Sequence, residues 1–322
     1  MFRPARLRTR PVLRDVLVDI NVQARKLVAP IFVKAGKSIK SPISSLPGHF
    51  QWSPDRVGEY VENLLESGIR QILLFGIPET KDAKGSDTCS ENGVIQESLR
   101  ALSEFKNDLV IITDVCFCEY TDHGHCGKLS ACETMGRLDM DATSEMIAEQ
   151  ALSHARAGTN VVAPSGMIDG MVEAIRLKLD TNGFSHIPIL SYAVKYASNF
   201  YGPFRAAAEG APKDGDRRSY QCDYRRKHEW QLEVDLDVQQ GADMLMVKPA
   251  GYYLDIISQV KARYPETPLY GYQVSGEYAM IKQAVENGAI NEEAIIESVT
   301  SIFRAGADQV VTYFAEEIAK GF

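Results

Sequence analysis

The sequence has few cysteines for its length, no long apolar run and no excess of positive charge. Six cysteines in 322 residues are too few for a disulfide framework, and three of them crowd into one segment, which favours a reducing compartment. No apolar run approaches the roughly 20 residues of a membrane span, and the basic N-terminus lacks the apolar core of a secretory signal. A formal net charge of −8 argues against general binding of nucleic acid or anionic membranes. These absences predict a cytoplasmic protein with neither nucleic acid nor membrane as a partner.

A further absence is a G-x-G-x-x-G motif after the first apolar run, and this weakens the case for a doubly wound dinucleotide-binding sheet. What is present is an alternation of short apolar runs with amphipathic segments. The predicted strands are 27–33, 71–77, 109–117, 160–166, 187–194, 243–250, 268–274 and 308–315. Helical segments are expected at 55–68, 144–158, 229–241 and 275–288. Eight strands alternating with helices predict an α/β protein with a parallel (β/α)₈ TIM barrel.

The first 26 residues precede the first strand and are rich in arginine. We expect residues 1–26 to form an extended N-terminal arm that is ordered against a neighbouring subunit. Residues 27–322 would then form the barrel catalytic domain. In such a barrel, functional side chains gather where the strands end, in the loops of one face.

Two lysines lie at the ends of consecutive apolar strands, Lys195 in SYAVKYAS and Lys248 in MLMVKPA. A charged amine is costly to bury, and adjacent strands would bring the two ammonium groups close together. Desolvation and mutual repulsion would favour the neutral amine, which attacks carbonyl groups. Either lysine alone could instead reach solvent or pair with a carboxylate. The pair on neighbouring strands favours Schiff-base chemistry.

Three cysteines, Cys116, Cys118 and Cys126, follow the third strand in TDVCFCEYTDHGHCG. Three thiolates that leave a fourth position open are typical of a catalytic zinc site. His123 and His125 could complete a closed, structural site instead, and the spacing alone leaves both possibilities open. The remaining cysteines are expected to be plain thiols: Cys89, Cys132 and Cys222.

The segment 199–221, between the fifth and sixth strands, is rich in Gly, Ala, Pro and charged residues. We predict a long, mobile loop that acts as a lid, as long loops in barrels commonly do. Arg205 and Arg217 on this loop could bind a substrate carboxylate with paired hydrogen bonds, although each could equally be an exposed surface arginine.

Taken together, the motifs resemble those of the porphobilinogen synthase (5-aminolevulinate dehydratase) family, nearly from end to end. The resemblance is carried, in this order, by RLRTRPVLRDVL, LVAPIFV, SENGVIQ, TDVCFCEYTDHGHCG, VAPSGMIDG, SYAVKYASNFYGPFR, GDRRSYQ, GADMLMVKPAGYYLDII, YQVSGEYAMI and VVTYFA. It implies a TIM barrel with an N-terminal arm, assembled as a homo-octamer from arm-hugging dimers.

The resemblance also implies a hydro-lyase of tetrapyrrole (heme) biosynthesis, which condenses two 5-aminolevulinate molecules to porphobilinogen with loss of two waters. Lys248 matches the lysine that holds one substrate as a Schiff base at the propionate side of the product, and Lys195 matches the lysine at the acetate side. The matches to substrate-binding residues are Ser275 and Tyr313 for the first substrate, and Arg205, Arg217 and Gln221 for the second. Asp114 and Ser165 are weaker candidates for polar assistance near the lysines.

For metals, the resemblance implies zinc at Cys116, Cys118 and Cys126, because the magnesium-dependent branch of the family has aspartates there. Zinc would act as a Lewis acid. Glu233 aligns with the family's acidic residue for a remote activating magnesium. Departures from the family pattern occur at Gly166, at Met171 and in the segment 222–230, and they put the lid, the subunit contacts and the magnesium site in doubt.

Two other hypotheses remain. The chain could be a class I aldolase-like barrel with one Schiff-base lysine, although one lysine would then suffice. It could also be a catalytically silent, zinc-stabilised barrel that serves as an assembly partner. Removing zinc would lower the thermal stability of such a barrel, whereas a catalytic zinc could be lost with little unfolding.

Overall fold

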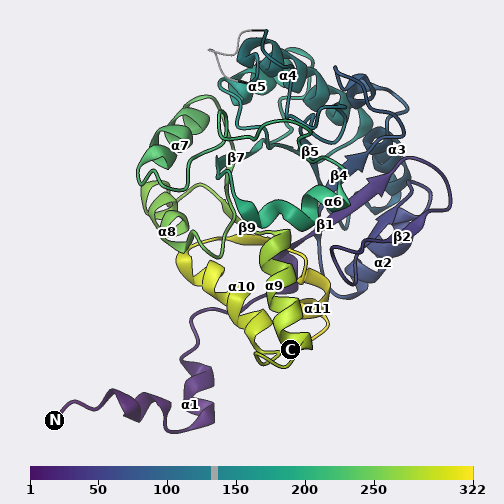
Figure 1. Cartoon of the computed structure of the whole chain (residues 1–322). Coiled ribbons are helices and arrows are strands. Elements are labelled where there is room, and N and C mark those ends of the chain that lie inside the picture. Colours follow the sequence, from purple (N-terminus) through teal and green to yellow (C-terminus); the bar gives the residue numbers. More distant parts are fainter. Residues whose placement is uncertain (132–136, 322) are drawn as a thin grey trace.

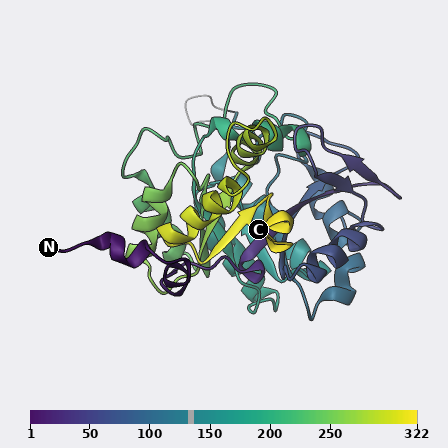
Figure 2. The same ribbon diagram turned by 90° about the horizontal axis from the view of Figure 1, so that it is seen from below.

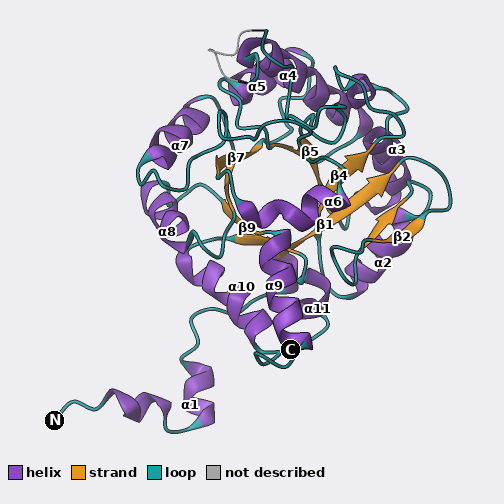
Figure 3. Ribbon diagram, viewed as in Figure 1, coloured by secondary structure: helices purple, strands orange, loops and turns teal. Residues whose placement is uncertain are grey.

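The computed structural model describes residues 1–131 and 137–321. A ring of parallel strands lies at the centre, with helices packed around it (Figure 1, Figure 3). Within these described ranges the ring comprises β1 (Leu27–Lys34), β4 (Gln71–Ile77), β5 (Val110–Val115), β6 (Val161–Pro164), β7 (Leu190–Lys195), β8 (Met244–Lys248), β9 (Leu269–Gln273) and β10 (Gln309–Thr312). The predicted (β/α)₈ barrel is confirmed.

The strands are hydrogen-bonded in the order β6-β5-β4-β1-β10-β9-β8-β7, and all of these pairs are parallel. An isolated parallel bridge between Val162 and Ile189 joins the two ends of this order. The strands are aliphatic because both of their faces are covered, one by the barrel interior and one by helices. In β1, for example, every residue from Leu27 to Val33 is buried.

The helices described around the ring are α2 (Val57–Glu66), α3 (Val94–Ala101), α4 (Met140–Ala157), α5 (Met171–Thr181), α7 (Glu229–Gln239), α8 (Leu254–Arg263), α9 (Ser275–Glu286), α10 (Ala294–Ala305) and α11 (Ala315–Ala319). Helix α4 begins four residues earlier than predicted, because Asp139 caps it by accepting a hydrogen bond from the Ala142 amide at 3.2 Å. It ends at Gly158, whose φ of 102° suits glycine. None of the helices in the described part of the chain has the length and hydropathy to traverse a bilayer.

The sequence prediction lacked a hairpin beside β1 and a helix after β7. A short hairpin of β2 (Lys40–Pro42) and β3 (Phe50–Trp52) extends the sheet beside β1. In addition, the segment predicted to be a continuous loop after β7 contains helix α6 (Gly202–Ala207), with Pro203 in its first turn. This helix lies across the mouth of the ring (Figure 1). Phe204 anchors it, with its ring centroid 4.9 Å from that of Phe75.

The N-terminal residues extend away from the barrel in both views (Figure 1, Figure 2). They form two 3₁₀ turns, Pro4–Arg8 and Ala24–Lys26, on either side of helix α1 (Pro11–Val16), and none of the three elements has a buried residue. Among the exposed side chains of this segment are the apolar ones of Val12, Val16, Leu17 and Val18.

Candidate active site

The two predicted lysines lie side by side at the mouth of the barrel. Lys195 is the last residue of β7 and Lys248 the last of β8, and the two are direct partners in the parallel register. Their exposed fractions are 5% and 4%. The prediction that neighbouring strands bring two buried amines together is therefore correct.

An irregularity in β7 produces this alignment. Ser191 pairs with Leu245 and Val194 pairs with Val247, so three steps along β7 match only two along β8. Because side chains alternate between the faces of a strand, one extra residue reverses the alternation beyond it. Tyr192 and Lys195 are three residues apart, yet both side chains consequently lie on the same side of β7 as Lys248. The Tyr192 ring centroid lies 5.5 Å from Lys195 Nζ and 5.1 Å from Lys248 Nζ.

Aromatic rings enclose the amine of Lys248. Its Nζ lies 4.0 Å from the ring centroid of Tyr272 and 5.1 Å from that of Phe204. Burial, with Lys195 adding repulsion, lowers the pKa of Lys248 to about 7. A substantial fraction of this amine is therefore uncharged at neutral pH, as attack on a carbonyl requires.

Polar groups gather beside Lys195. Its Nζ donates a hydrogen bond to the Ser165 carbonyl at 2.6 Å, and the Ser165 hydroxyl donates to Asp114 Oδ2 at 3.2 Å. Burial raises the pKa of Asp114 to about 6, and the charges of Lys195 and Lys248 limit the rise. The weaker candidates Asp114 and Ser165 thus lie next to the lysine pair.

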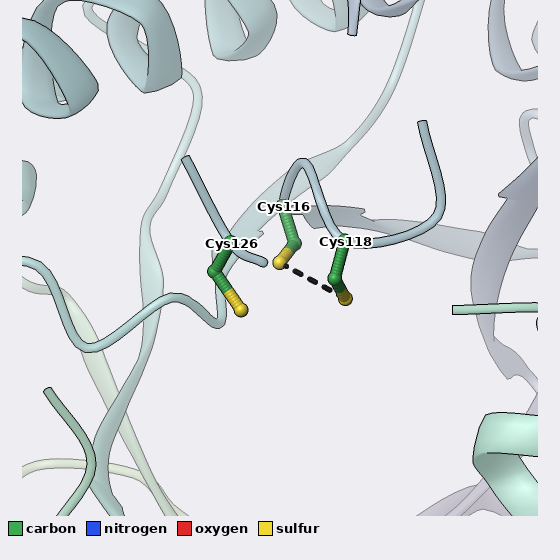
Figure 4. A group of neighbouring side chains, drawn as sticks. All are labelled: Cys116, Cys118 and Cys126. Carbon is green, nitrogen blue, oxygen red and sulfur yellow. Dashed lines mark hydrogen bonds between the residues drawn. The ribbon is translucent and has the colours of Figure 1, made fainter. Parts of the chain in front are cut away.

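The three thiols of Cys116, Cys118 and Cys126 converge in a buried loop (Figure 4). The Sγ atoms of Cys116 and Cys118 are 3.4 Å apart, and all three lie within 4.8 Å of one another. Hydrogen bonding to Cys118 and Cys126, with burial, raises the pKa of Cys116 well above its usual value. Hydrogen bonds from Cys116 and Cys118 lower the pKa of Cys126 well below it. The three sulfur atoms are therefore linked by S–H hydrogen bonds, and a bound metal ion would displace these protons.

This donor set fits a zinc ion. Three soft thiolates on one side of a small space, without a fourth protein ligand in the same described group, are the open arrangement of catalytic zinc sites. Neither nearby histidine closes the site: His125 Nδ1 lies 3.0 Å from the Tyr220 hydroxyl and Nε2 lies 2.8 Å from the Asp214 carbonyl oxygen. His123 Nδ1 accepts a hydrogen bond from the His125 amide at 3.1 Å. The closed-site alternative is thus not supported.

Residues 208–221, which we call the lid segment, are the part of the predicted loop 199–221 that follows α6. Arg217 is 5% exposed, and its Nη2 donates to the carbonyls of Gly124 and Gly210 at 3.0 and 2.8 Å. Gly124, at φ 72°, permits this approach, since a Cβ there would lie 2.2 Å from the Ala211 carbonyl oxygen. The lid segment is therefore tied to the loop that carries the thiols.

Several polar atoms of the predicted substrate-binding residues are buried without a protein partner in the described structure. They are Arg205 Nε, Arg217 Nε, and both Gln221 Oε1 and Nε2. Gln221 lies near the lysine pair, because the next residue, Cys222, donates its amide hydrogen to the Lys195 carbonyl at 3.0 Å. Buried polar atoms of this kind need a partner. A carboxylate would satisfy the two guanidinium groups.

Ser275 and Tyr313 lie on the other side of Lys248. Ser275 begins α9, and its Oγ accepts a hydrogen bond from the Phe204 amide at 2.9 Å, which joins α6 to α9. The Tyr313 hydroxyl is 3.4 Å from that of Tyr272, whose ring faces the Lys248 amine. Tyr313 therefore contacts the tyrosine whose ring faces the Lys248 amine, and Ser275 contacts α6, the helix that lies across the barrel mouth.

Glu233 is not part of this cluster. It lies on α7 in a separate cavity of about 220 Å³, which it lines together with Asp169, Asp237 and Met171. Burial and the neighbouring carboxylates of Asp237 and Asp169 raise the pKa of Glu233 to about 7. A cation would relieve this repulsion, whereas Met171 adds only a thioether, a poor ligand for magnesium.

The departures from the family pattern leave the lysines and thiols untouched. Met171 is 2% exposed and packs in the apolar cluster around α4 and α5. A Cβ on Gly166 would lie 2.9 Å from Ile168 Cγ1. Asp223 pairs with Arg225, and its amide donates to Glu229. Of the cysteines expected to be plain thiols, burial raises the pKa of both Cys89 and Cys222, and Cys132 lies outside the described residues.

Sequence reasoning missed two buried carboxylates. Glu277 accepts hydrogen bonds from the amides of Gly251 and Val274, both at 2.7 Å, and so joins the loops that follow β8 and β9. Glu119, 2% exposed, lies within the thiol loop itself. A charged residue next to buried cysteines was a signal for Glu119, but Glu277 resembles an ordinary first-turn helix glutamate.

The chain is similar in sequence to one family of known proteins over almost its whole length. The family model described as "Delta-aminolevulinic acid dehydratase" matches residues 1–321. Among curated proteins of that name, the one from Archaeoglobus fulgidus is 49% identical over 308 residues, which are 96% of this chain and 94% of that protein. The one from Synechocystis sp. is 46% identical over 320 residues, 99% of this chain and 98% of that protein.

Among solved structures, the delta-aminolevulinic acid dehydratase (porphobilinogen synthase) of Toxoplasma gondii superposes with a TM-score of 0.95. It is 37% identical, and the match covers 99% of this chain and 91% of that one. That crystal structure is a complex with the reaction product, porphobilinogen.

Proposed function

The chain belongs to the delta-aminolevulinic acid dehydratase family, and from this we propose that it makes porphobilinogen through Schiff bases on Lys248 and Lys195. Each uncharged amine would add to the keto carbon of one 5-aminolevulinate, and the resulting carbinolamine would lose water to give the imine. One carbon–carbon and one carbon–nitrogen bond would then join the two substrates, and their formation would expel both lysine amines and give the pyrrole. The net loss is the two waters released when the imines form.

The observation that carries this proposal is the register of β7 and β8. It sets two buried lysines directly opposite one another, where an aldolase-like reaction would need only one. The aromatic enclosure of Lys248 supports its role as a nucleophilic amine, because burial among the rings disfavours the ammonium form.

We assign the substrate carboxylates to the two sides of this pair. Ser275 and Tyr313 would bind the carboxylate of the substrate on Lys248. Arg205, Arg217 and Gln221 would bind that of the substrate on Lys195, and their unpartnered buried atoms support this assignment. Closure of the lid segment over the second substrate would then exclude water from the reacting atoms.

Cys116, Cys118 and Cys126 would hold zinc, which would supply Lewis-acid polarisation beside Lys195. Glu233 would hold a remote magnesium together with the carboxylates of its cavity. Since the thiols must stay reduced to bind a metal, we assign the protein to the cytoplasm. The exposed apolar side chains of the N-terminal arm support contact with another subunit in a homo-octamer.

The test is porphobilinogen formation from 5-aminolevulinate by purified protein, before and after chelation and then with zinc or magnesium restored. We expect chelation to abolish activity, and zinc but not magnesium to restore it, while the melting temperature changes little. Inactivity with zinc on folded protein would instead support the silent-barrel hypothesis.

Borohydride trapping followed by peptide mass spectrometry tests the lysines separately. We expect substrate-dependent adducts on both Lys248 and Lys195. Lys195→Met and Lys248→Met should each lose at least about 10³-fold in activity, because an essential nucleophile is removed. The exposed Lys106→Met serves as the matched control with wild-type activity. Adducts on one lysine only would favour the aldolase-like alternative.

A further inference from the structure

A second group of potential metal ligands lies beside the thiols. In the described structure, one ligand atom from each of Asp114, Cys116 and Glu119 lies within 4.8 Å of the other two. All three residues are buried, with exposed fractions of 7%, 1% and 2%. The group shares Cys116 with the thiol set but adds two carboxylates.

Both carboxylates have an oxygen atom without a partner. Asp114 Oδ1 and Glu119 Oε1 are buried and accept no hydrogen bond from the described protein. The other Asp114 oxygen accepts from Ser165, and the Tyr192 hydroxyl also contacts the Asp114 carboxyl. The Glu119 carboxyl also contacts the Cys118 thiol. A buried carboxylate oxygen without a donor is costly unless a cation or a water satisfies it.

The donor chemistry selects the kind of ion. Two carboxylate oxygens and one thiolate are a mixed hard and soft set, which zinc accepts at about 2.0–2.3 Å. Magnesium is a poor match, because it prefers oxygen ligands in a near-ideal octahedron. At these bond lengths the ligand atoms lie about 3.5 Å apart, so donors that are now within 4.8 Å of one another need to close by up to about 1.3 Å.

From this we infer that Asp114, Cys116 and Glu119 form a second zinc-binding position, bridged to the thiol site through the Cys116 sulfur. This inference goes beyond the proposed function, since the group exists whether or not the thiol site is catalytic. It makes the pocket able to hold two borderline divalent cations, one with three sulfur ligands and one with mixed ligands.

The experiment counts zinc ions on the full-length protein. Metal-free protein carrying Glu233→Gln, which removes the remote acidic ligand, is saturated with Zn²⁺, freed of unbound metal and assayed for zinc per chain. We expect two ions per chain, and one after Glu119→Gln is added. The exposed Glu145→Gln is the matched control and should retain two.

Titration with Co²⁺ adds a readout of the ligands. Because Cys116 would donate to both ions, the second Co²⁺ should increase the thiolate charge-transfer absorption, and Glu119→Gln should abolish that second step. If Glu119→Gln does not fold, as judged by circular dichroism, Asp114→Asn answers the same question.

A single ion per chain at saturation overturns the inference, as do two ions that persist in the Glu119→Gln protein. Porphobilinogen formation is measured on the one-ion protein in parallel. Activity with one ion bound leaves the proposed function intact even if the second position does not exist.

Discussion

At the scale of single residues, Lys248 illustrates how surroundings decide chemistry. An ordinary lysine amine is almost wholly protonated at neutral pH. Here the rings of Tyr272 and Phe204 and the adjacent Lys195 make the charged form unfavourable. The positions of Lys248 and Lys195 at the ends of consecutive apolar strands were sufficient to predict a buried pair. The ring identities were not predictable, because they come from strands and helices far apart in the sequence.

This environment predicts a pH dependence of activity. The protonated amine is inactive, so kcat/KM should rise with pH through the Lys248 pKa of about 7 and then level off. Between pH 8 and pH 6 the uncharged fraction falls roughly ten-fold. The rate of borohydride trapping at Lys248 should follow the same curve. Zinc content measured at each pH excludes metal loss as the cause, and a flat profile over this range would contradict the assignment.

At the scale of elements, the thiol loop and the lid segment form a connected unit. His125 contacts Asp214 and Tyr220 of the lid segment, and Arg217 reaches back to Gly124. The C-x-C-x₇-C spacing was sufficient to predict that the three thiols lie close together, because the cysteines are near one another in the sequence. The role of His125 could not be read there, since its partners are 89 and 95 residues away.

The contacts of His125 predict the result of replacing it. His125→Ala should leave zinc stoichiometry unchanged, because both ring nitrogens already face lid partners. It should raise KM by up to about 30-fold, since two hydrogen bonds that hold the lid segment are lost, at about 1 kcal/mol each. Tyr220→Phe removes only one of these bonds and should give a smaller increase. Loss of zinc from His125→Ala would instead identify the histidine as a metal ligand.

At the scale of the whole molecule, the barrel and the N-terminal residues differ in how they are stabilised. The barrel has two large buried apolar clusters, whereas the residues before Asp19 bury no side chain. Short apolar runs in the sequence predicted the buried strands of the barrel, and the arginine-rich stretch at 1–26 predicted an arm. The role of that arm stays a prediction. The subunit arrangement does not follow from one chain, since an exposed apolar side chain identifies no partner.

Deleting residues 2–18 should therefore leave a folded barrel that forms a smaller assembly. Circular dichroism should retain the wild-type helix and strand content, and sedimentation velocity should give a lower mass than full-length protein. Replacing Val12, Val16 and Leu17 with serine should have the same effect at unchanged length. An assembly of wild-type mass after either change would show that the arm is not the principal subunit contact.

The extra residue in β7 carries a consequence for how this chemistry tolerates sequence change. Side chains along β7 alternate between the barrel interior and the outer helices, and the extra residue reverses which positions face the interior beyond it. Removing one residue between Ser191 and Val194 would alter neither the composition of the strand nor its apolar character. It would restore the one-to-one match with β8. Ser191 faces the outer helices, where it donates to Asp237, and Lys195 would then lie three steps further along and still face the interior opposite Lys248. We therefore expect a single-codon deletion at this point to preserve both the barrel and the lysine pair.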